Sequence, residues 1–249
     1  MDVLHTSGSA SVGDLADSLD VTEATVRRTL RRLAREGRVI RTYGGATVVA
    51  GAASLATADS DAQRLQKRAI GLAASELVED GSTVALSSGS TVLELARGLR
   101  DRQLTIITNA LDVAALLLDA PSVKLVILGG VVLPGVHSTR GHLTEDSIRD
   151  LRADTLFMGA SAIDLETGFM TEQVAEIAVD RALRAMARDA VILADSSKFD
   201  RVAPGFMFGF EQVGTLVTDA RVHQTTVEAV SAMGTRVMAV REGGAAADR

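Results

Sequence analysis

The sequence predicts an α/β protein with two domains, an N-terminal winged helix-turn-helix and a C-terminal domain built on a mostly parallel sheet. The first observation is the order of patterns in residues 1–49, which reads helix, tight turn, helix, β-hairpin. The second is that residues 61–249 alternate short apolar runs with helical periods, as strands joined by crossover helices do. Residues 50–60 are small and unpatterned, which predicts a flexible linker.

The first helix is predicted from Ser11 to Leu19. Ser11 and Asp14 have the S-x-x-D spacing of an N-terminal capping box, and apolar residues follow at helical spacing. The turn that comes after this helix leads to a second, arginine-rich helix.

The second helix is amphipathic. Val26, Leu30 and Leu33 recur at i, i+4 and i+7, so this stripe packs inward while the arginines point outward. Thr22 can cap the start of the helix, and Gly37 can end it in the left-handed conformation.

A β-hairpin is predicted after this helix. Residues 38–43 read as a strand, Gly44 and Gly45 as the hairpin turn, and residues 46–49 as the return strand. This hairpin would be the wing of the domain.

Positive charge is concentrated in this part of an acidic chain. The net charge is −6 overall, whereas residues 1–49 hold seven Arg against six Asp and Glu, a net +1, which leaves −7 for the remainder. Such an asymmetry is typical of a nucleic-acid-binding module joined to a domain that does not bind nucleic acid.

The predicted partner of the basic helix is an operator in double-stranded DNA. A recognition helix places its N-terminal side chains against base edges, and arginine can bridge guanine there, whereas later arginines contact phosphates. A solvated basic helix paired with acidic residues is the alternative, yet only Glu23 and Glu36 lie nearby. The predicted DNA-binding residues are Thr22, Thr25, Arg27, Arg28, Arg31, Arg32, Arg41, Tyr43, Gly44 and Gly45.

The segment VTEATVRRTLRRLAREGRVIRTYGGA resembles the N-terminal signature of the DeoR family of bacterial transcriptional regulators. The chain departs from the family at Thr29, where Asp is usual. Family members also carry a longer first helix than residues 1–6 allow, so we expect a truncated helix or a start codon upstream. The resemblance implies a repressor of a sugar-catabolism operon that works as a homodimer or homotetramer.

The C-terminal domain is predicted to contain seven strands and five helices. The predicted strands are residues 83–86, 104–107, 124–128, 155–158, 191–194, 214–218 and 236–240. The predicted helices are residues 61–80, 91–99, 110–118, 172–188 and 225–233. Ligands of such sheets bind beyond the carboxyl ends of the strands, and residues 87–91 form a loop there with hydroxyls, a glycine and free N–H groups suited to phosphate.

Residues 64–219 resemble the effector domain of the same family, whose fold is similar to ribose-5-phosphate isomerase and which senses phosphorylated sugars or related metabolites. The resemblance implies that Ser88, Gly89, Ser90 and Thr91 bind phosphate. It implies that Asp164 and Lys198 contact the sugar hydroxyls or the carbonyl end, although Lys198 could bind the phosphate instead. It also implies that Thr108, Asn109 and Gly130 line the pocket. Helix capping by Ser90 or Thr91 is the structural alternative.

A sugar-phosphate isomerase is the alternative function. Isomerisation needs a carboxylate base close to the substrate carbon. In the isomerases that this domain resembles, this base is a glutamate 18 residues before a lysine. The residue 18 positions before Lys198 in this chain is Asp180. The regulators usually have Lys at this position. The preceding TEQVAEIAVD lacks the glycine-rich turn of the enzymes, so we interpret Asp180 as a surface ion pair beside Arg181. A ligand-binding module that has lost DNA binding is a third possibility.

The remaining candidates are few. Asp154 precedes an apolar strand and is expected to anchor backbone, and residues 206–210 suggest buried strand packing, with a subunit interface as the alternative. His137 and His142 could meet, although exposed loop positions are expected. The chain has no cysteine, and its four histidines lack metal-ligand spacing, so we expect neither metal nor cofactor. The start lacks a secretory signal and no apolar run reaches about 18 residues, which predicts a cytoplasmic protein without a membrane span.

Overall fold

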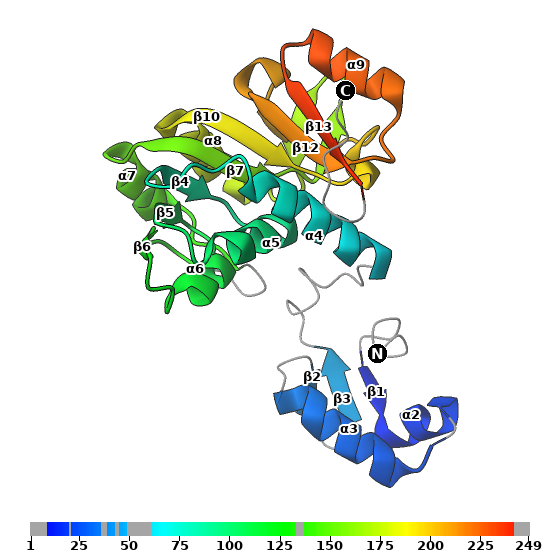
Figure 1. Ribbon diagram of the computed structural model, residues 1–249. Coiled ribbons are helices and arrows are strands. Elements are labelled where there is room, and N and C mark those ends of the chain that lie inside the picture. The colour runs from blue at the N-terminus through cyan, green and yellow to red at the C-terminus, as the bar shows by residue number, and fades with distance from the viewer. Residues whose placement is uncertain are drawn as a thin grey trace. The chain divides into compact units, whose positions relative to one another are not determined.

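The computed structural model describes residues 9–19, 21–35, 39–42, 45–48, 61–132 and 137–241 (Figure 1). The described residues up to 48 belong to one compact unit and those from 61 onward to a second. Several predicted features lie outside the described residues, namely the shortened helix in 1–6, the helix end at Gly37, the wing residues Tyr43 and Gly44, and the linker 50–60. The boundaries at residues 49 and 61 therefore stay predictions.

The N-terminal unit is a winged helix, as the sequence predicts. Its elements are β1 (Ser9–Ser11), α2 (Val12–Leu19), α3 (Glu23–Arg35), β2 (Val39–Thr42) and β3 (Gly45–Val48). The capping box forms, because the Ser11 hydroxyl accepts the Asp14 N–H at 3.1 Å while the Asp14 carboxylate accepts the Ser11 N–H at 3.3 Å. Val12, Leu15 and Ala16 of α2 are buried with Val26 and Leu30 of α3.

Strand β3 lies in the middle of the antiparallel sheet, in the order β1-β3-β2. Gly45 pairs with Thr42 on one side and with Ser11 on the other. The prediction that Gly45 belongs to the hairpin turn was therefore wrong. The short strand β1, which sequence patterns did not indicate, supplies the second partner that holds Gly45 in the sheet.

The C-terminal unit is built on a parallel sheet of seven strands within the described residues. The strands are β4 (Thr83–Leu86), β5 (Leu104–Thr108), β6 (Val123–Ile127), β7 (Ala153–Gly159), β10 (Ala187–Leu193), β12 (Thr215–Asp219) and β13 (Arg236–Val240). Their order is β13-β12-β10-β7-β4-β5-β6, and all neighbours are parallel. All seven predicted strands are present.

Helices cover both faces of this sheet and create two hydrophobic cores. The helices are α4 (Asp61–Ser75), α5 (Ser90–Leu99), α6 (Leu111–Leu117), α7 (His142–Arg149), α8 (Ile177–Met186) and α9 (Gln224–Ala232). Side chains of α4, α5 and α6 fill one core, and those of α7, α8 and α9 fill the other. Successive strand residues alternate between them, since Val84 and Leu86 enter the first core and Ala85 the second.

Helix α4 ends at Ser75, five residues earlier than predicted, and the N–H groups of residues 76–78 make i→i−3 hydrogen bonds instead. The Arg102 guanidinium donates to the carbonyls of Ser75 at 3.2 Å and Val78 at 2.8 Å. Gly71 allows α4 and α5 to approach closely, since a Cβ at this position would lie 2.6 Å from the Leu95 backbone nitrogen. The predicted helix 172–188 was also too long, because Ala187 already begins β10 and a 3₁₀ turn, η1 (Val174–Glu176), precedes α8.

A small antiparallel sheet and helix α7 were not predicted. The sheet has the order β11-β9-β8, from β8 (Ala162–Asp164), β9 (Gly168–Thr171) and β11 (Gly205–Phe208). Phe208 and Phe210 are buried beside Phe169, with 4.8 Å between the ring centroids of Phe169 and Phe210. The buried packing expected for residues 206–210 thus holds at Met207, Phe208 and Phe210, whereas Phe206 is 44% exposed.

Asp154 anchors the backbone, as predicted, because its carboxylate accepts the Thr83 N–H at 2.9 Å. His137 and His142 are both exposed, as expected, but only His137 lies in a loop, because His142 begins α7. His137 Nδ1 contacts the Asp112 carboxylate at 2.9 Å. Within the described part of the chain, every helix is too short or too polar to cross a bilayer.

The chain changes direction in the sheet between β4 and β7. From β4 it continues outward through β5 and β6 on one side, and it then returns to β7 on the other side and continues through β10 and β12. Loops at the carboxyl ends of β4 and β7 diverge at such a point and leave a crevice in which ligands of open α/β sheets bind. The fold therefore places the 87–91 loop at the expected ligand position.

Candidate functional site

The start of α3 has the geometry of a capped recognition helix. The Thr22 hydroxyl accepts the Thr25 N–H at 3.3 Å, and the Thr22 and Thr25 hydroxyls are 3.0 Å apart. Both residues are exposed. The predicted cap at Thr22 is confirmed, and it presents the first turn of α3 to solvent.

The arginines of the first turns are also exposed. Arg27 pairs with Glu23 at 2.6 Å, and about half of each side chain is accessible. An exposed pair of this kind is worth about 0–1 kcal/mol, so a phosphate or a guanine edge can displace the carboxylate. Arg28 is exposed beside it. The side chains of Arg31, Arg32 and Arg41, like residues 43 and 44, lie outside what the structure describes.

The 87–91 loop joins β4 to α5 and leaves the helix start open. Gly89 is the N-cap residue, with φ of 135°, and no side-chain hydrogen bond caps α5 among the described residues. This backbone favours glycine, and a Cβ there would meet nothing within 4 Å. Ser88 and Ser90 are partly buried, and Thr91 is 8% exposed. No side chain among the described residues therefore caps the N–H groups of the first turn.

Thr108 at the end of β5 and Asn109 after it differ in the pairing of their polar side-chain atoms. The Thr108 hydroxyl is fully buried, where it donates to the Leu86 carbonyl at 2.7 Å and accepts the Ala110 N–H at 3.0 Å. The Asn109 amide donates to the Thr139 carbonyl at 3.2 Å, but its buried Oδ1 has no hydrogen-bond partner within the described residues.

Gly130, after β6, lies against the protein. Its φ is 153°, and a Cβ would lie 2.0 Å from the Thr144 hydroxyl and 3.0 Å from the Arg140 carbonyl. Two backbone hydrogen bonds of 3.0 Å join Val131 to Arg140 alongside it. The glycine therefore allows residues 138–140 to pack against the end of β6.

Asp164 closes the hairpin between β8 and β9. Its carboxylate accepts the N–H of Thr167 at 2.9 Å and that of Glu166 at 3.2 Å. The hydrogen bonds from Thr167, followed by that from Glu166, lower the pKa of Asp164 and keep it ionised.

Lys198 lies in the loop after β10. Asp195 and Asp219 hold this loop, because they accept the Ser197 N–H at 3.0 Å and the Ser196 N–H at 2.7 Å, respectively. Burial opposes ionisation of Asp219, but the hydrogen bonds from Ser196 and Arg221 outweigh burial and lower its pKa. The Lys198 side chain is half-buried.

Sequence reasoning missed a buried polar cluster beside these loops. Arg140 Nη2 pairs with Glu176 Oε1 at 2.7 Å, and the Ser138 hydroxyl donates to the same oxygen at 2.6 Å. Asp180, one helical turn after Glu176, is buried and interacts electrostatically with both members of this pair. We call Asn109, Ser138, Arg140, Glu176 and Asp180 the Arg140 cluster. The separation of 36 positions between Arg140 and Glu176 explains why no local pattern revealed it.

Asp180 is buried, so the interpretation as a surface ion pair with Arg181 was wrong. Its exposure is 6%, and the Arg181 guanidinium instead donates to the carbonyls of Phe206 and Met207. Burial, followed by repulsion from Glu176, raises the pKa of Asp180 to about 7, against an opposing effect of Arg140. The carboxyl group of Asp180 therefore titrates near neutral pH.

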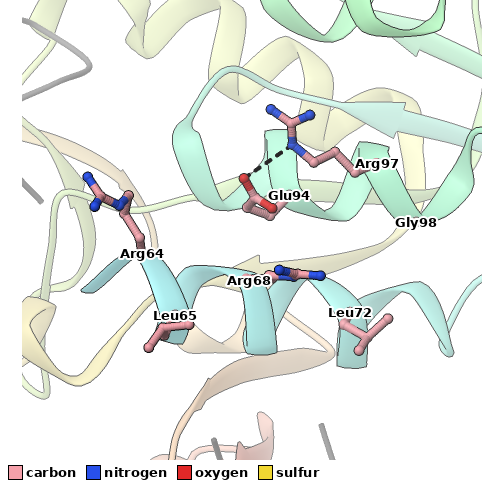
Figure 2. A pocket seen from close by; sticks show the side chains of 7 residues that line it. All are labelled: Arg64, Leu65, Arg68, Leu72, Glu94, Arg97 and Gly98. Atoms are coloured by element: carbon pink, nitrogen blue, oxygen red, sulfur yellow. Dashed lines mark hydrogen bonds and ion pairs between the residues drawn. The ribbon is translucent and has the colours of Figure 1, made fainter. Parts of the chain in front are cut away.

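A groove between α4 and α5 is a separate feature. Arg64 and Arg68 of α4 line it with Arg97 of α5, which donates to Glu94 at 3.3 Å (Figure 2). Leu65 and Leu72 are half exposed at its border. The groove follows the later turns of α5 and is distinct from the 87–91 loop at the start of that helix.

The fold and the site define a class of protein, a DNA-binding helix joined to a ligand-sensing α/β unit. Family comparison agrees, since residues 1–51 match the DeoR-like helix-turn-helix domain and residues 62–220 match the DeoR C-terminal sensor domain. The chain belongs to the DeoR family of transcriptional regulators. It is thus a regulator and not an enzyme.

Curated relatives cover nearly the whole chain. The transcriptional repressor AccR of Agrobacterium fabrum is 31% identical over 92% of this chain and 90% of its own length. The HTH-type transcriptional repressor CsqR of Escherichia coli is 32% identical over 85% of this chain and 82% of its own length. Among solved structures, ribose 5-phosphate isomerase A from Methanocaldococcus jannaschii is 20% identical, with a TM-score of 0.41 over 56% of this chain and 55% of that one.

Proposed function

We propose that the protein is a repressor of a sugar-catabolism operon and that a phosphorylated sugar releases it from its operator. In this proposal residues 1–49 bind DNA, residues 50–60 are the linker and residues 61–249 bind the effector. The observation that carries the effector part is the open start of α5 at the point where the sheet changes direction. The operator lies on the chromosome, so the proposal requires a cytoplasmic protein.

The phosphate would lie against the first turn of α5. A helix start carries unpaired N–H groups and a partial positive charge, and both favour an anion. Gly89 lets the anion approach the backbone, while Ser88, Ser90 and Thr91 supply hydroxyl donors. Thr108 supports this loop indirectly, since its hydroxyl donates to the Leu86 carbonyl just before it, whereas Gly130 packs against Thr144 and Arg140.

The DNA would be read by the start of α3. Thr25, Arg27 and Arg28 are exposed there, and a recognition helix inserts these positions into the major groove. Two copies of the chain would bind two half-sites, so we propose a homodimer or homotetramer. A coupling free energy of about 1–3 kcal/mol between effector and DNA would change operator affinity about 5–150-fold.

Fluorescence anisotropy with DNA from upstream of the gene tests the DNA part. We expect Arg28→Ala to weaken operator binding by about 1–3 kcal/mol, because it removes a contact to a base or phosphate. Arg188→Ala is the matched control, since this arginine is 84% exposed on the sensor unit and its loss changes net charge equally. Equal affinities of the two variants, or no binding of any upstream fragment by the wild type, would contradict the proposal.

A second experiment tests the effector part. Ser90→Asp places a carboxylate at the start of α5, where it favours the helix but repels a phosphate. We expect sugar phosphates to raise the Tm of the wild type and to release it from DNA, and expect both effects to disappear in Ser90→Asp. The control is Ser122→Asp, at an exposed position before β6. A full response in Ser90→Asp would exclude the phosphate site.

A further inference from the structure

The Arg140 cluster adjoins the proposed phosphate site. Asn109 follows β5, and β5 is hydrogen-bonded to β4, which leads into the 87–91 loop. Neighbouring strands are about 4.8 Å apart, so the ends of β4 and β5 lie within the length of one sugar phosphate. Residues 138–140 lie beside Asn109, because the Thr139 N–H donates to the Asn109 carbonyl at 2.8 Å. Asn109, the member of the cluster nearest to β4, therefore lies within the length of one ligand anchored at the start of α5.

Two atoms of the cluster have no hydrogen-bond partner within the described residues. Asn109 Oδ1 is an acceptor and Arg140 Nε is a donor, on side chains of residues that are 2% and 6% exposed. Buried polar atoms are nearly always paired, so an acceptor and a donor left over in neighbouring segments indicate a missing polar group. A hydroxyl group both donates and accepts, and it satisfies either atom.

The charges of the cluster favour a neutral group over an anion. Glu176 already balances Arg140 at 2.7 Å, and Asp180 adds a second carboxyl group that faces both. An added carboxylate would lie near one guanidinium and two carboxyl groups, with no unbalanced positive charge to hold it.

We propose that the Arg140 cluster reads the sugar end of the effector and selects a neutral, hydroxyl-bearing end over a carboxylate. The proposal deepens the proposed function and rests on it. It assigns the effector to the neutral sugar or polyol phosphates, and it makes phosphorylated sugar acids poor ligands. Asn109 and Arg140 contact the hydroxyls, while Glu176 sets the charge of the site.

The test compares two open-chain ligands that differ only at carbon 1, sorbitol 6-phosphate and 6-phosphogluconate. Isothermal titration of the full-length protein gives the ratio of their Kd values. For the wild type we expect sorbitol 6-phosphate to bind at least about tenfold more tightly. Glu176→Gln leaves Arg140 unbalanced and should lower this ratio about tenfold, whereas Arg140→Gln should raise it. A purely structural role would weaken both ligands alike.

Two outcomes overturn the proposal. If Glu176→Gln and Arg140→Gln fold and leave the ratio unchanged, while Ser90→Asp abolishes binding of both ligands, the proposed function stands and the inference is wrong. If the wild type binds neither ligand nor inorganic phosphate, both are wrong. Circular dichroism confirms folding of each variant. Should Glu176→Gln fail to fold, Asp180→Asn replaces it, since loss of the second carboxyl group should also lower the ratio.

Discussion

Arg140 and Glu176 form an ion pair of 2.7 Å between two segments that lie 36 residues apart in the chain. Their side chains are 8% and 12% exposed, and the Ser138 hydroxyl donates to the same carboxylate oxygen. The pair joins residues 138–140 to the start of α8. Because both groups are desolvated, removing one leaves the other buried without its partner, which is costly.

The first prediction concerns the stability of the fold against pH. The pKa of Asp180 is raised from 3.8 to about 7 by burial and by Glu176, with Arg140 opposing. Between these two pH values the unfolded chain releases a proton that the folded chain keeps, so stability falls as pH rises. Above pH 7 the full cost is about 4 kcal/mol. We expect Asp180→Asn to be more stable than the wild type at pH 8.

Urea denaturation at several pH values checks this prediction. The difference between Asp180→Asn and the wild type should shrink as pH falls from 7 to 4, because the folded carboxyl group stays protonated while the unfolded one is protonated ever more readily. Asp146→Asn is a suitable control, since Asp146 is an exposed residue of α7. A stability difference that does not depend on pH would refute the titration of Asp180 near neutrality.

The second prediction concerns the turn after β6. We expect Gly130→Ala to destabilise the C-terminal unit by about 1–3 kcal/mol, because its backbone is strained for alanine and its Cβ would collide with the Thr144 hydroxyl. Gly129→Ala is the matched control, since its Cβ would meet nothing within 4 Å. Chemical denaturation measures both. Equal stabilities of the two variants would show that the collision with Thr144 does not destabilise the C-terminal unit.

The third prediction concerns the packing of α4 on α5. Alanine is intrinsically better than glycine in a helix by about 1 kcal/mol. At Gly71, however, a Cβ would lie 2.6 Å from the Leu95 backbone nitrogen, so we expect a net loss of stability in Gly71→Ala. At Gly13 in α2 the nearest atom is 3.7 Å away, and Gly13→Ala should not destabilise its own unit. A gain of Tm in Gly71→Ala would contradict the close approach of the helices.

The fourth prediction concerns the cap of α3. Thr22→Ala removes the acceptor of the Thr25 N–H and should cost about 1 kcal/mol, whereas Thr22→Ser keeps the hydroxyl and should cost little. Because the capped turn presents Thr25, Arg27 and Arg28, we also expect weaker operator binding in Thr22→Ala. Thermal denaturation followed by anisotropy titration checks both effects. Identical behaviour of the two variants would exclude a role for the cap.

Local patterns predicted the features that depend on neighbouring residues. The apolar runs located all seven strands of the large sheet, and the S-x-x-D spacing located the start of α2. The cap at Thr22 and the backbone anchor at Asp154 followed from residue type and position. In each case the determining contacts lie within a few residues or at the end of a strongly apolar segment.

Features that depend on distant contacts escaped prediction. Strands β8, β9 and β11 are short, and β11 pairs with β9 across more than 30 residues of chain, so no single segment has a clear strand pattern. Gly45 looked like a turn residue because its partner Ser11 is 34 positions away. The burial of Asp180 depends on packing of α8 against other elements, and its helical pattern alone could not separate a surface from a buried position.

The opening turn of α5, with Gly89 in front of it, offers main-chain N–H groups to a bound anion in addition to the hydroxyls of Ser88, Ser90 and Thr91. Main-chain donors persist when side chains are exchanged, so under the proposed function the anchoring half of the pocket resists sequence drift. The other half can then vary without loss of the anchor. A regulator descended from this one could respond to a different phosphorylated metabolite after few substitutions, while its phosphate-binding turn stays the same.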